Sequence, residues 1–135
     1  MKLILEPLQK AINALVKALD EYDKNPNEFV KDSCIQRFEF TYDLSQKMIK
    51  RYLENTEANP EELKEMDFQN IIRKAYEKGL IIGEWKDWRE YRKDRGATSH
   101  TYNEDVADQV FNNIPDFLQE AQALLAELKK RNDHN

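Results

Sequence analysis

The chain has 135 residues, the size of one ordinary domain, which leaves little room for a second. A hydrophobic fraction of 40% supplies a core and argues against wholesale disorder, whereas three glycines and four prolines are too few for the many turns of an all-β fold. The net charge of −5 argues against broad nonspecific binding to nucleic acid.

The N-terminal segment and the single cysteine indicate the compartment. No apolar run reaches the roughly 20 residues of a membrane span. The apolar start Met1–Leu5 turns polar at Glu6, too early for a secretory signal. Cys34 alone cannot form an intrachain disulfide, and its place on an apolar stripe predicts a buried small side chain. We therefore expect a cytoplasmic protein.

The first half of the chain predicts two long helices. Apolar residues recur at alternating spacings of three and four from Leu5 to Tyr22, and Asn25–Asn27 ends this helix because its central residue is a proline. A second stripe runs from Val30 to about Glu54, widened by Phe40 and Leu44. A helix that is apolar over more than one face is usually central or shared between subunits.

A third helix is predicted from about Pro60, with an interruption near Asp67. Gly79 is its expected C-terminal cap, where a left-handed residue is favoured, and Leu80–Gly83 is a short apolar connector. The acidic run Glu57–Glu65 has no spacing suited to metal ligands and is expected to be a solvated face.

A fourth helix is predicted from Glu84 to about Ser99. The fifth begins at a capping box formed by Thr101 with Glu104, or at Asn103. Its apolar stripe continues through Pro115, which indicates a kink within the helix.

The predicted fold is a single all-α domain over residues 1–135, an up-and-down antiparallel bundle of about five helices. The tail 132–135, which includes His134, is expected to fray.

One segment, Trp85–Glu104, concentrates residues with chemical potential: Arg89, Arg92, Lys93, Arg95, His100 and Tyr102. Its tryptophans, Trp85 and Trp88, are expected to anchor the core or an interface and not to stack on bases. On an unbroken helix a five-residue step turns by about 140°, so Arg95 and His100 would lie on different faces.

If the helix ends near Thr98 or Ser99, the following turn can bring His100 and Tyr102 back toward Arg95. Arginine binds phosphate through paired hydrogen bonds, and histidine transfers protons near neutral pH. Arg92 or Lys93 would assist in attracting a phosphate. The alternatives are a histidine that only caps or packs at the helix end, and a Tyr102 packed beneath the turn with its hydroxyl bonded to a neighbour.

Residues 79–115, together with the block from Gln36 to Leu44, resemble the nucleotidyltransferase substrate-binding protein family. That family belongs to the HEPN class, which includes the HepT toxins. Arg95 and His100 match its Arg-x4–6-His motif, and Tyr102 matches the extended form Arg-x4-His-x-Tyr. Gly96 departs from the polar residue that commonly follows the motif arginine, and Gln46 stands where the family often has tryptophan.

The resemblance implies a homodimer that places two motifs around one cleft, and we expect the helices around Phe38 and Tyr42 at the subunit boundary. It also implies a partner, a separate minimal nucleotidyltransferase that lacks its own helical substrate domain. In HepT relatives, the partner silences an RNase by placing AMP on the motif tyrosine, which here is Tyr102.

Two hypotheses follow. In the first, the chain is a non-catalytic dimer that docks the nucleotidyltransferase and binds nucleotide through Arg92, Arg95 and His100. In the second, it is a metal-independent endoribonuclease with Arg95 and His100 as catalytic residues and RNA as substrate. The acidic balance and Gly96 favour the first. A purely structural helical dimer is the third interpretation. None of them calls for a metal or cofactor.

Overall fold

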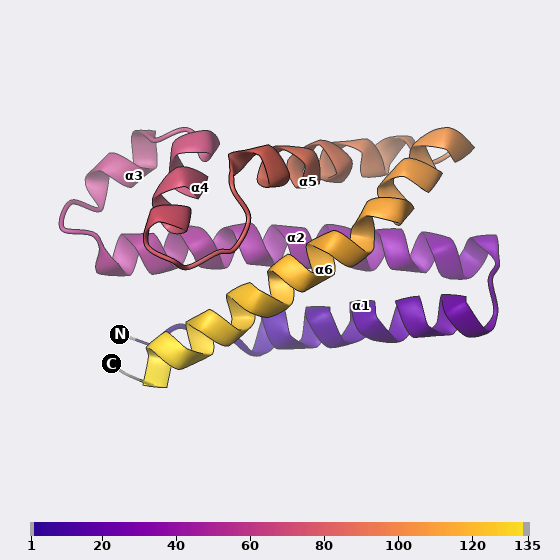
Figure 1. Ribbon diagram of the computed structural model, residues 1–135, viewed down its shortest axis with the longest axis horizontal. Helices are drawn as coiled ribbons and strands as arrows, with labels where there is room; N and C mark the ends of the chain where they lie inside the picture. Colours follow the sequence, from indigo (N-terminus) through magenta and orange to yellow (C-terminus); the bar gives the residue numbers. More distant parts are fainter. Residues whose placement is uncertain (1, 134–135) are drawn as a thin grey trace.

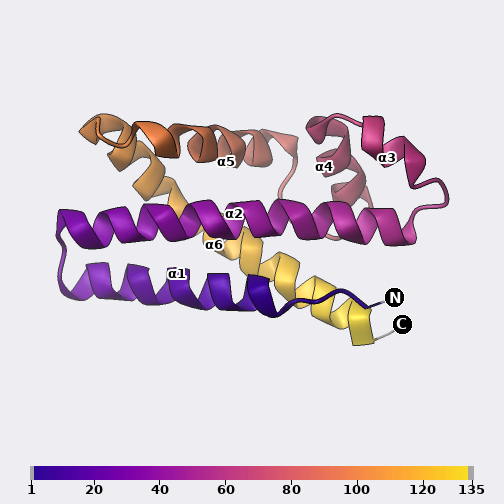
Figure 2. The same ribbon diagram turned by 180° about the vertical axis from the view of Figure 1, so that it is seen from behind.

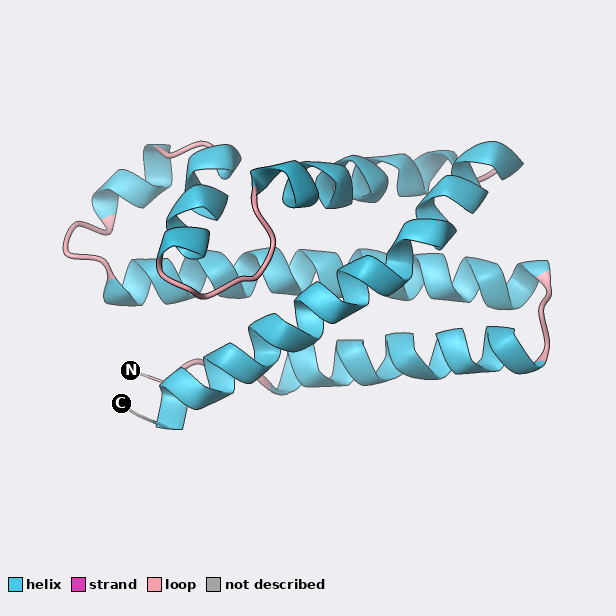
Figure 3. Cartoon of the chain, viewed as in Figure 1, coloured by secondary structure: helices cyan, strands magenta, loops and turns pink. Residues whose placement is uncertain are grey.

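The computed structural model describes residues 2–133, and its regular structure is entirely helical (Figure 3). The elements are α1 (Glu6–Lys24), α2 (Glu28–Thr56), α3 (Glu61–Glu65), α4 (Phe68–Glu77), α5 (Trp85–Ala97), the 3₁₀ turn η1 (Thr98–His100) and α6 (Glu104–Asp133). The all-α helical bundle expected from the sequence is confirmed, with six α-helices in the described part of the chain.

The first two helices, α1 and α2, form an antiparallel hairpin. Pro7 lies in the first turn of α1, where its missing N–H costs no hydrogen bond. The side chain of Asn27 accepts a hydrogen bond from the backbone N–H of Val30 at 3.0 Å and so caps α2. As Figures 1 and 2 show, α5 lies along α2, and α6 crosses α1 and α2 obliquely on one side.

The expected third helix is two helices, α3 and α4. Met66 and Asp67 have extended backbones between them, and the Asp67 carboxylate accepts the backbone N–H of Asn70 at 2.9 Å, which starts α4. Gly79, with φ of 71°, is the C-terminal cap that the sequence predicted. The backbone N–H of Leu80 bonds to the carbonyl of Ala75 at 3.0 Å there.

At the start of α6 the cap is Asn103 and not the Thr101–Glu104 box. Its side-chain oxygen accepts the backbone N–H of Asp105 at 2.9 Å, whereas the Thr101 hydroxyl donates backward to the carbonyl of Thr98. The helix continues through Pro115.

The last helix extends further than the sequence predicted, because α6 reaches Asp133. The side-chain amide of Asn132 both donates to and accepts from the backbone of Leu3, at 2.9 and 3.1 Å. This pair of hydrogen bonds ties the last turn of α6 to the N-terminal segment. Residues 134–135, including His134, lie outside the described residues.

The centre of the core is a group of aromatic rings from α2, α5 and α6. Phe117 meets Phe38 edge-on at 5.2 Å between ring centroids and Trp88 at 6.1 Å. Tyr42 and Tyr91 complete the group, at 5.9 and 5.2 Å from Phe117. These contacts fix the position of α5 on α2, and with it the turn that follows α5.

A buried carboxylate holds the connector before α5 in place. Glu120 of α6 accepts hydrogen bonds from the backbone N–H groups of Ile82 and Gly83, at 3.0 and 2.7 Å, and from the Trp88 indole at 3.1 Å. A Cβ at Gly83 would lie 2.2 Å from a Glu120 oxygen, so a larger residue here would displace this hydrogen-bonded carboxylate. Trp88 is fully buried, as expected for a core anchor.

Candidate functional site

The candidate site is the motif turn, residues 95–102, where α5 ends and the chain reverses into α6. α5 stops at Ala97, close to the end predicted from the sequence. The Thr98 hydroxyl donates to the carbonyl of Arg95 at 2.8 Å, and the backbone N–H of Asn103 bonds to the carbonyl of His100 at 3.2 Å. These bonds fold the turn tightly at one end of the bundle.

Arg95 joins the motif turn to α2. Its Nε and Nη2 atoms donate to the two carboxylate oxygens of Asp43 at 2.9 and 3.1 Å, a bidentate pair. Nη2 also lies 3.3 Å from the carboxylate of Glu39, and Nη1 donates to the Thr98 hydroxyl at 3.3 Å. Each guanidinium nitrogen therefore has a protein partner.

The electrostatics of this cluster favour a permanently charged arginine. The hydrogen bond to Asp43, and then the charges of Asp43 and Glu39, hold the pKa of Arg95 above its ordinary value. Two carboxylates face one guanidinium, so the immediate cluster carries a net negative charge. A phosphate that approached Arg95 would have to compete with both acids.

Glu39 and Asp43 were not among the site residues predicted from the sequence. They belong to the block 36–44, which resembles the family as a whole segment and singles out neither acid. Their spacing of four places both on one face of α2, which was the available signal. The sequence did not show that α5 packs on that face of α2.

His100 and Tyr102 are presented to solvent. Both side chains are exposed, Tyr102 to 86%, and their ring centroids lie 6.2 Å apart at a tilt of 74°. Within the described residues, neither ring makes a side-chain hydrogen bond. The alternative of a Tyr102 packed beneath the turn is therefore wrong, because the 3₁₀ turn directs this side chain outward.

The cations expected to gather around Arg95 do not form one cluster with it. Arg92 lies with its guanidinium carbon 5.0 Å from the ring centroid of Phe68 on α4, a cation–π contact. Lys93 is exposed and makes no ion pair within residues 2–133. Because Arg95 faces α2 and Arg92 faces α4, the structure brings Arg95 together with acids and Arg92 with an aromatic ring.

An acidic pocket of about 350 Å³ adjoins Tyr102. It is lined by Thr101, Ala107 and Tyr102 and by charged side chains from the first turns of α2 and α6: Glu28, Lys31, Asp32, Glu104 and Asp108. Lys31 is ion-paired with Asp108, so three carboxylates of this lining remain without a cation among the described residues. Negative potential beside Tyr102 opposes binding of a polyanion on this side of the turn.

Asp94, next to Arg95 in sequence, points the other way, into the contact between α5 and α6. It is buried and accepts a hydrogen bond from Asn113 at 2.9 Å, while its second oxygen has no partner among the described residues. Burial raises the pKa of this carboxyl. Asp94 therefore contributes to the contact between α5 and α6 and not to the motif turn.

The remaining expectations concern residues outside the turn. Cys34 is buried, as predicted, and burial raises the pKa of its thiol. Trp85 packs edge-on against Phe68 at 5.9 Å. The part of the chain that the structure describes has no group of three or more His, Cys, Asp or Glu side chains placed to hold a metal ion. None of its helices is long and apolar enough to cross a membrane.

Comparison with known proteins places this site in context. Residues 3–130 match the model of a family described as nucleotidyltransferase substrate binding protein like. A Haemophilus influenzae protein named as a probable ribonuclease HepT is 40% identical over 118 residues, covering 84% of this chain and 80% of that protein.

Solved structures agree with that match. A Haemophilus influenzae structure, described as the fold of a substrate binding domain of a nucleotidyltransferase, superimposes with a TM-score of 0.87 at 35% identity. It covers 93% of this chain and 99% of the other. A Thermus thermophilus protein matches with a TM-score of 0.75 at 30% identity, covering 90% and 98%. The chain therefore belongs to the nucleotidyltransferase substrate-binding protein family.

Proposed function

We propose that this chain is the substrate- and nucleotide-binding partner subunit of a separate minimal nucleotidyltransferase, and that it acts as a homodimer in the cytoplasm. The observation that carries the proposal is the family match over residues 3–130, together with the solved structure described as a substrate binding domain of a nucleotidyltransferase. The motif turn supports docking of a partner enzyme, because a bidentate ion pair with α2 holds in place a tyrosine that is 86% exposed.

Arg95 and His100 are the proposed nucleotide-binding residues at the motif turn, and Arg92 joins them only if it leaves its contact with the Phe68 ring. One N–H of Arg95 Nη1 is not engaged by Thr98, and this N–H is the one available to a phosphate without breaking the pair with Asp43. The acids of α2 weaken phosphate binding in the isolated subunit. Nucleotide binding should therefore be stronger when the nucleotidyltransferase supplies further cations.

The second candidate function is a metal-independent endoribonuclease, and the HepT relative at 40% identity supports it. Arg95 would stabilise the charge that develops on the phosphorane, and His100 would transfer a proton during attack of the ribose 2′-hydroxyl. In that case Tyr102 is the silencing site. Its phenol oxygen attacks the α-phosphorus of ATP, pyrophosphate leaves, and the phenol proton passes to solvent.

One experiment separates the two candidates. The purified dimer is incubated with single-stranded RNA in the presence of a chelator, alongside Arg95→Ala, His100→Ala and Tyr102→Phe variants. Cleavage by the wild type that disappears in both Arg95→Ala and His100→Ala establishes the ribonuclease. No cleavage, together with saturable nucleotide binding to the complex with the nucleotidyltransferase, leaves the binding subunit.

A peptide-mapping experiment tests Tyr102. The protein is incubated with the nucleotidyltransferase, ATP and Mg²⁺, and the mass of each peptide is measured. An added AMP on the peptide carrying Tyr102, absent in Tyr102→Phe, makes this residue the acceptor. Modification at Tyr76, the other tyrosine exposed to a large extent at 43%, would show that solvent exposure alone directs the transfer.

A further inference from the structure

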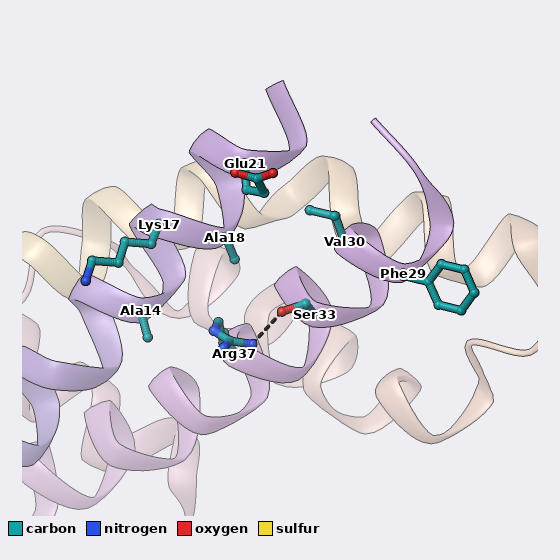
Figure 4. Close-up of a pocket in the computed structure, with 8 residues that line it drawn as sticks. All are labelled: Ala14, Lys17, Ala18, Glu21, Phe29, Val30, Ser33 and Arg37. Atoms are coloured by element: carbon teal, nitrogen blue, oxygen red, sulfur yellow. Dashed lines mark hydrogen bonds between the residues drawn. The ribbon is translucent and has the colours of Figure 1, made fainter. Parts of the chain in front are cut away.

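A pocket between α1 and α2 lies apart from the motif turn and is unused by the proposed function. Its volume is about 470 Å³, within the range of small-molecule sites. The floor is apolar, formed by Ala14, Ala18 and Val30. Figure 4 shows Ala18 and Val30 between the two helices, with Ser33 and Arg37 of α2 below them and Glu21 of α1 above.

Arg37 is the group on which the inference rests. Its side chain is half-buried, yet it makes no ion pair within residues 2–133. Its single side-chain partner among those residues is the hydroxyl of Ser33, to which Nη1 donates. The other N–H groups of its guanidinium have no acceptor in that part of the chain. An arginine left this way in a concave, largely apolar pocket is suited to a planar oxyanion, which accepts two parallel hydrogen bonds.

Glu21 lies on the opposite wall and makes no ion pair with any described residue either. The pocket thus holds two opposite charges apart across an apolar floor. Lys17 also lines it, but Figure 4 shows that side chain extending along α1, away from Arg37. A ligand with a carboxylate at one end and an ammonium group at the other would complement both walls, whereas a dianion would meet the charge of Glu21.

We infer that this pocket binds a small zwitterion with an apolar body, of the class of an amino acid with an aliphatic side chain. The carboxylate lies against Arg37 and Ser33, the ammonium group against Glu21, and the aliphatic body on the floor of Ala14, Ala18 and Val30. This site is independent of the nucleotidyltransferase partnership.

Three probes that share one aliphatic body test the inference: L-leucine, 4-methylpentanoate, which lacks the amine, and 3-methylbutylamine, which lacks the carboxylate. Binding to the full chain is measured by ligand-detected NMR titration. Leucine should bind saturably with a Kd of about 1 mM or tighter. 4-Methylpentanoate should bind more weakly, and 3-methylbutylamine should bind weakest of the three.

Two variants assign the charges. Arg37→Gln should lower the affinity for leucine and for 4-methylpentanoate by about tenfold or more, because it removes a charge-assisted hydrogen bond to their carboxylates. Glu21→Gln should remove the preference for leucine over 4-methylpentanoate, because the ammonium group of leucine then has no carboxylate to meet. Arg51→Gln, an exposed arginine on the same helix outside the pocket, is the matched control and should have no effect.

Several results would overturn the inference. They are the absence of saturable leucine binding to the wild type, undiminished binding to folded Arg37→Gln, or equal affinity for leucine and 4-methylpentanoate. Helical circular dichroism establishes that each variant is folded. If Arg37→Gln does not fold, Ser33→Ala takes its place as the test variant. In addition, the NMR chemical shifts of the backbone amides of Ala14 and Ala18 in the wild type must change when leucine is added.

Discussion

At the scale of single residues, the ion pair between Arg95 and Asp43 ties the motif turn to α2. Both hydrogen bonds of the pair have good length, and Glu39 adds a second carboxylate. Side-chain exposures of 31% for Arg95 and 51% for Asp43 mean that solvent screens the pair. Its contribution to stability is therefore small, and its role is to link the motif turn to α2 once the aromatic core has set the position of α5.

A double-mutant cycle with Asp43→Asn and Arg95→Gln measures this pair. We expect a coupling free energy of about 1 kcal/mol, the upper end for partly exposed pairs with bidentate geometry, from urea unfolding curves. The more exposed pair of Lys64 with Glu61 is the control and should give a coupling near zero. Equal coupling in the two cycles would contradict the role given to the bidentate contact.

Glu120 makes the stability of the fold depend on pH. Burial raises the pKa of its carboxyl above the usual 4.5, although the N–H groups of Ile82, Gly83 and Trp88 oppose that rise. The folded protein therefore retains a proton that the unfolded chain has already released. The stabilisation from this group is complete below pH 4.5 and is lost as the pH rises through the folded-state pKa.

The measurement is the free energy of unfolding of wild type and Glu120→Gln from about pH 4 to about pH 7. Glu120→Gln is less stable at every pH because an amide cannot accept all three hydrogen bonds. The difference between the two proteins should narrow as the pH rises, since only the wild type loses stability. A constant difference would show that Glu120 titrates alike in the folded and unfolded states.

At the scale of helices and connectors, two glycines have opposite roles. Gly96 lies inside α5, and a Cβ added there would have no atom within 4 Å, so nothing in the packing requires glycine. Gly83 lies in the connector that Glu120 holds, where a Cβ would collide with the carboxylate. An alanine should therefore stabilise the protein at position 96 and destabilise it at position 83.

We expect Gly96→Ala to raise the free energy of unfolding by about 0.5–1 kcal/mol, the ordinary gain within a helix. Gly83→Ala should lower it by about 1–3 kcal/mol through overpacking against Glu120. Thermal melts of the two variants beside the wild type measure both effects. A loss of stability in Gly96→Ala would contradict the open surroundings of Gly96 and would indicate that another group, such as one from a second subunit, packs against it.

At the scale of the whole molecule, the exposed residues of α2 indicate where a second subunit could pack in the proposed homodimer. Phe38 and Tyr42, around which the subunit boundary was expected, are buried inside their own protomer. Phe40 lies between them in sequence on the outer face and is 52% exposed, beside Glu39 and Asp43. If the part of α2 around Phe38 and Tyr42 forms the boundary, Phe40 is the exposed apolar side chain there that reaches the second subunit.

Sedimentation at micromolar concentration should give about twice the chain mass of 16.1 kDa. Phe40→Asp should shift the protein toward monomer without lowering its helix content, because Phe40 is outside the core. Ile4→Asp, which changes another exposed apolar residue, is the control and should remain dimeric. A wild-type monomer throughout this range would remove the two-motif cleft from both candidate functions.

The sequence by itself determined most of the helices and several of their ends, because these depend on neighbours a few residues apart. The apolar stripe of α2, the left-handed Gly79 and the end of α5 near Thr98 all follow from local periodicity and backbone preference. The break between α3 and α4 was visible only as an interruption near Asp67, since a two-residue extended link has a weak local signal. The family motif located the turn but not its partners.

Only the tertiary structure decided what each motif side chain contacts. The partners of Arg95 lie 52 and 56 residues earlier in the chain, on a helix whose exposed face has no periodic signal that points to α5. The outward direction of Tyr102, the contact of Arg92 with Phe68 and the burial of Glu120 likewise depend on how α4, α5 and α6 pack around α2. Ion pairs and buried carboxylates form between residues distant in sequence, and the free energy that selects them comes from the packing of the aromatic core, which local pattern does not encode.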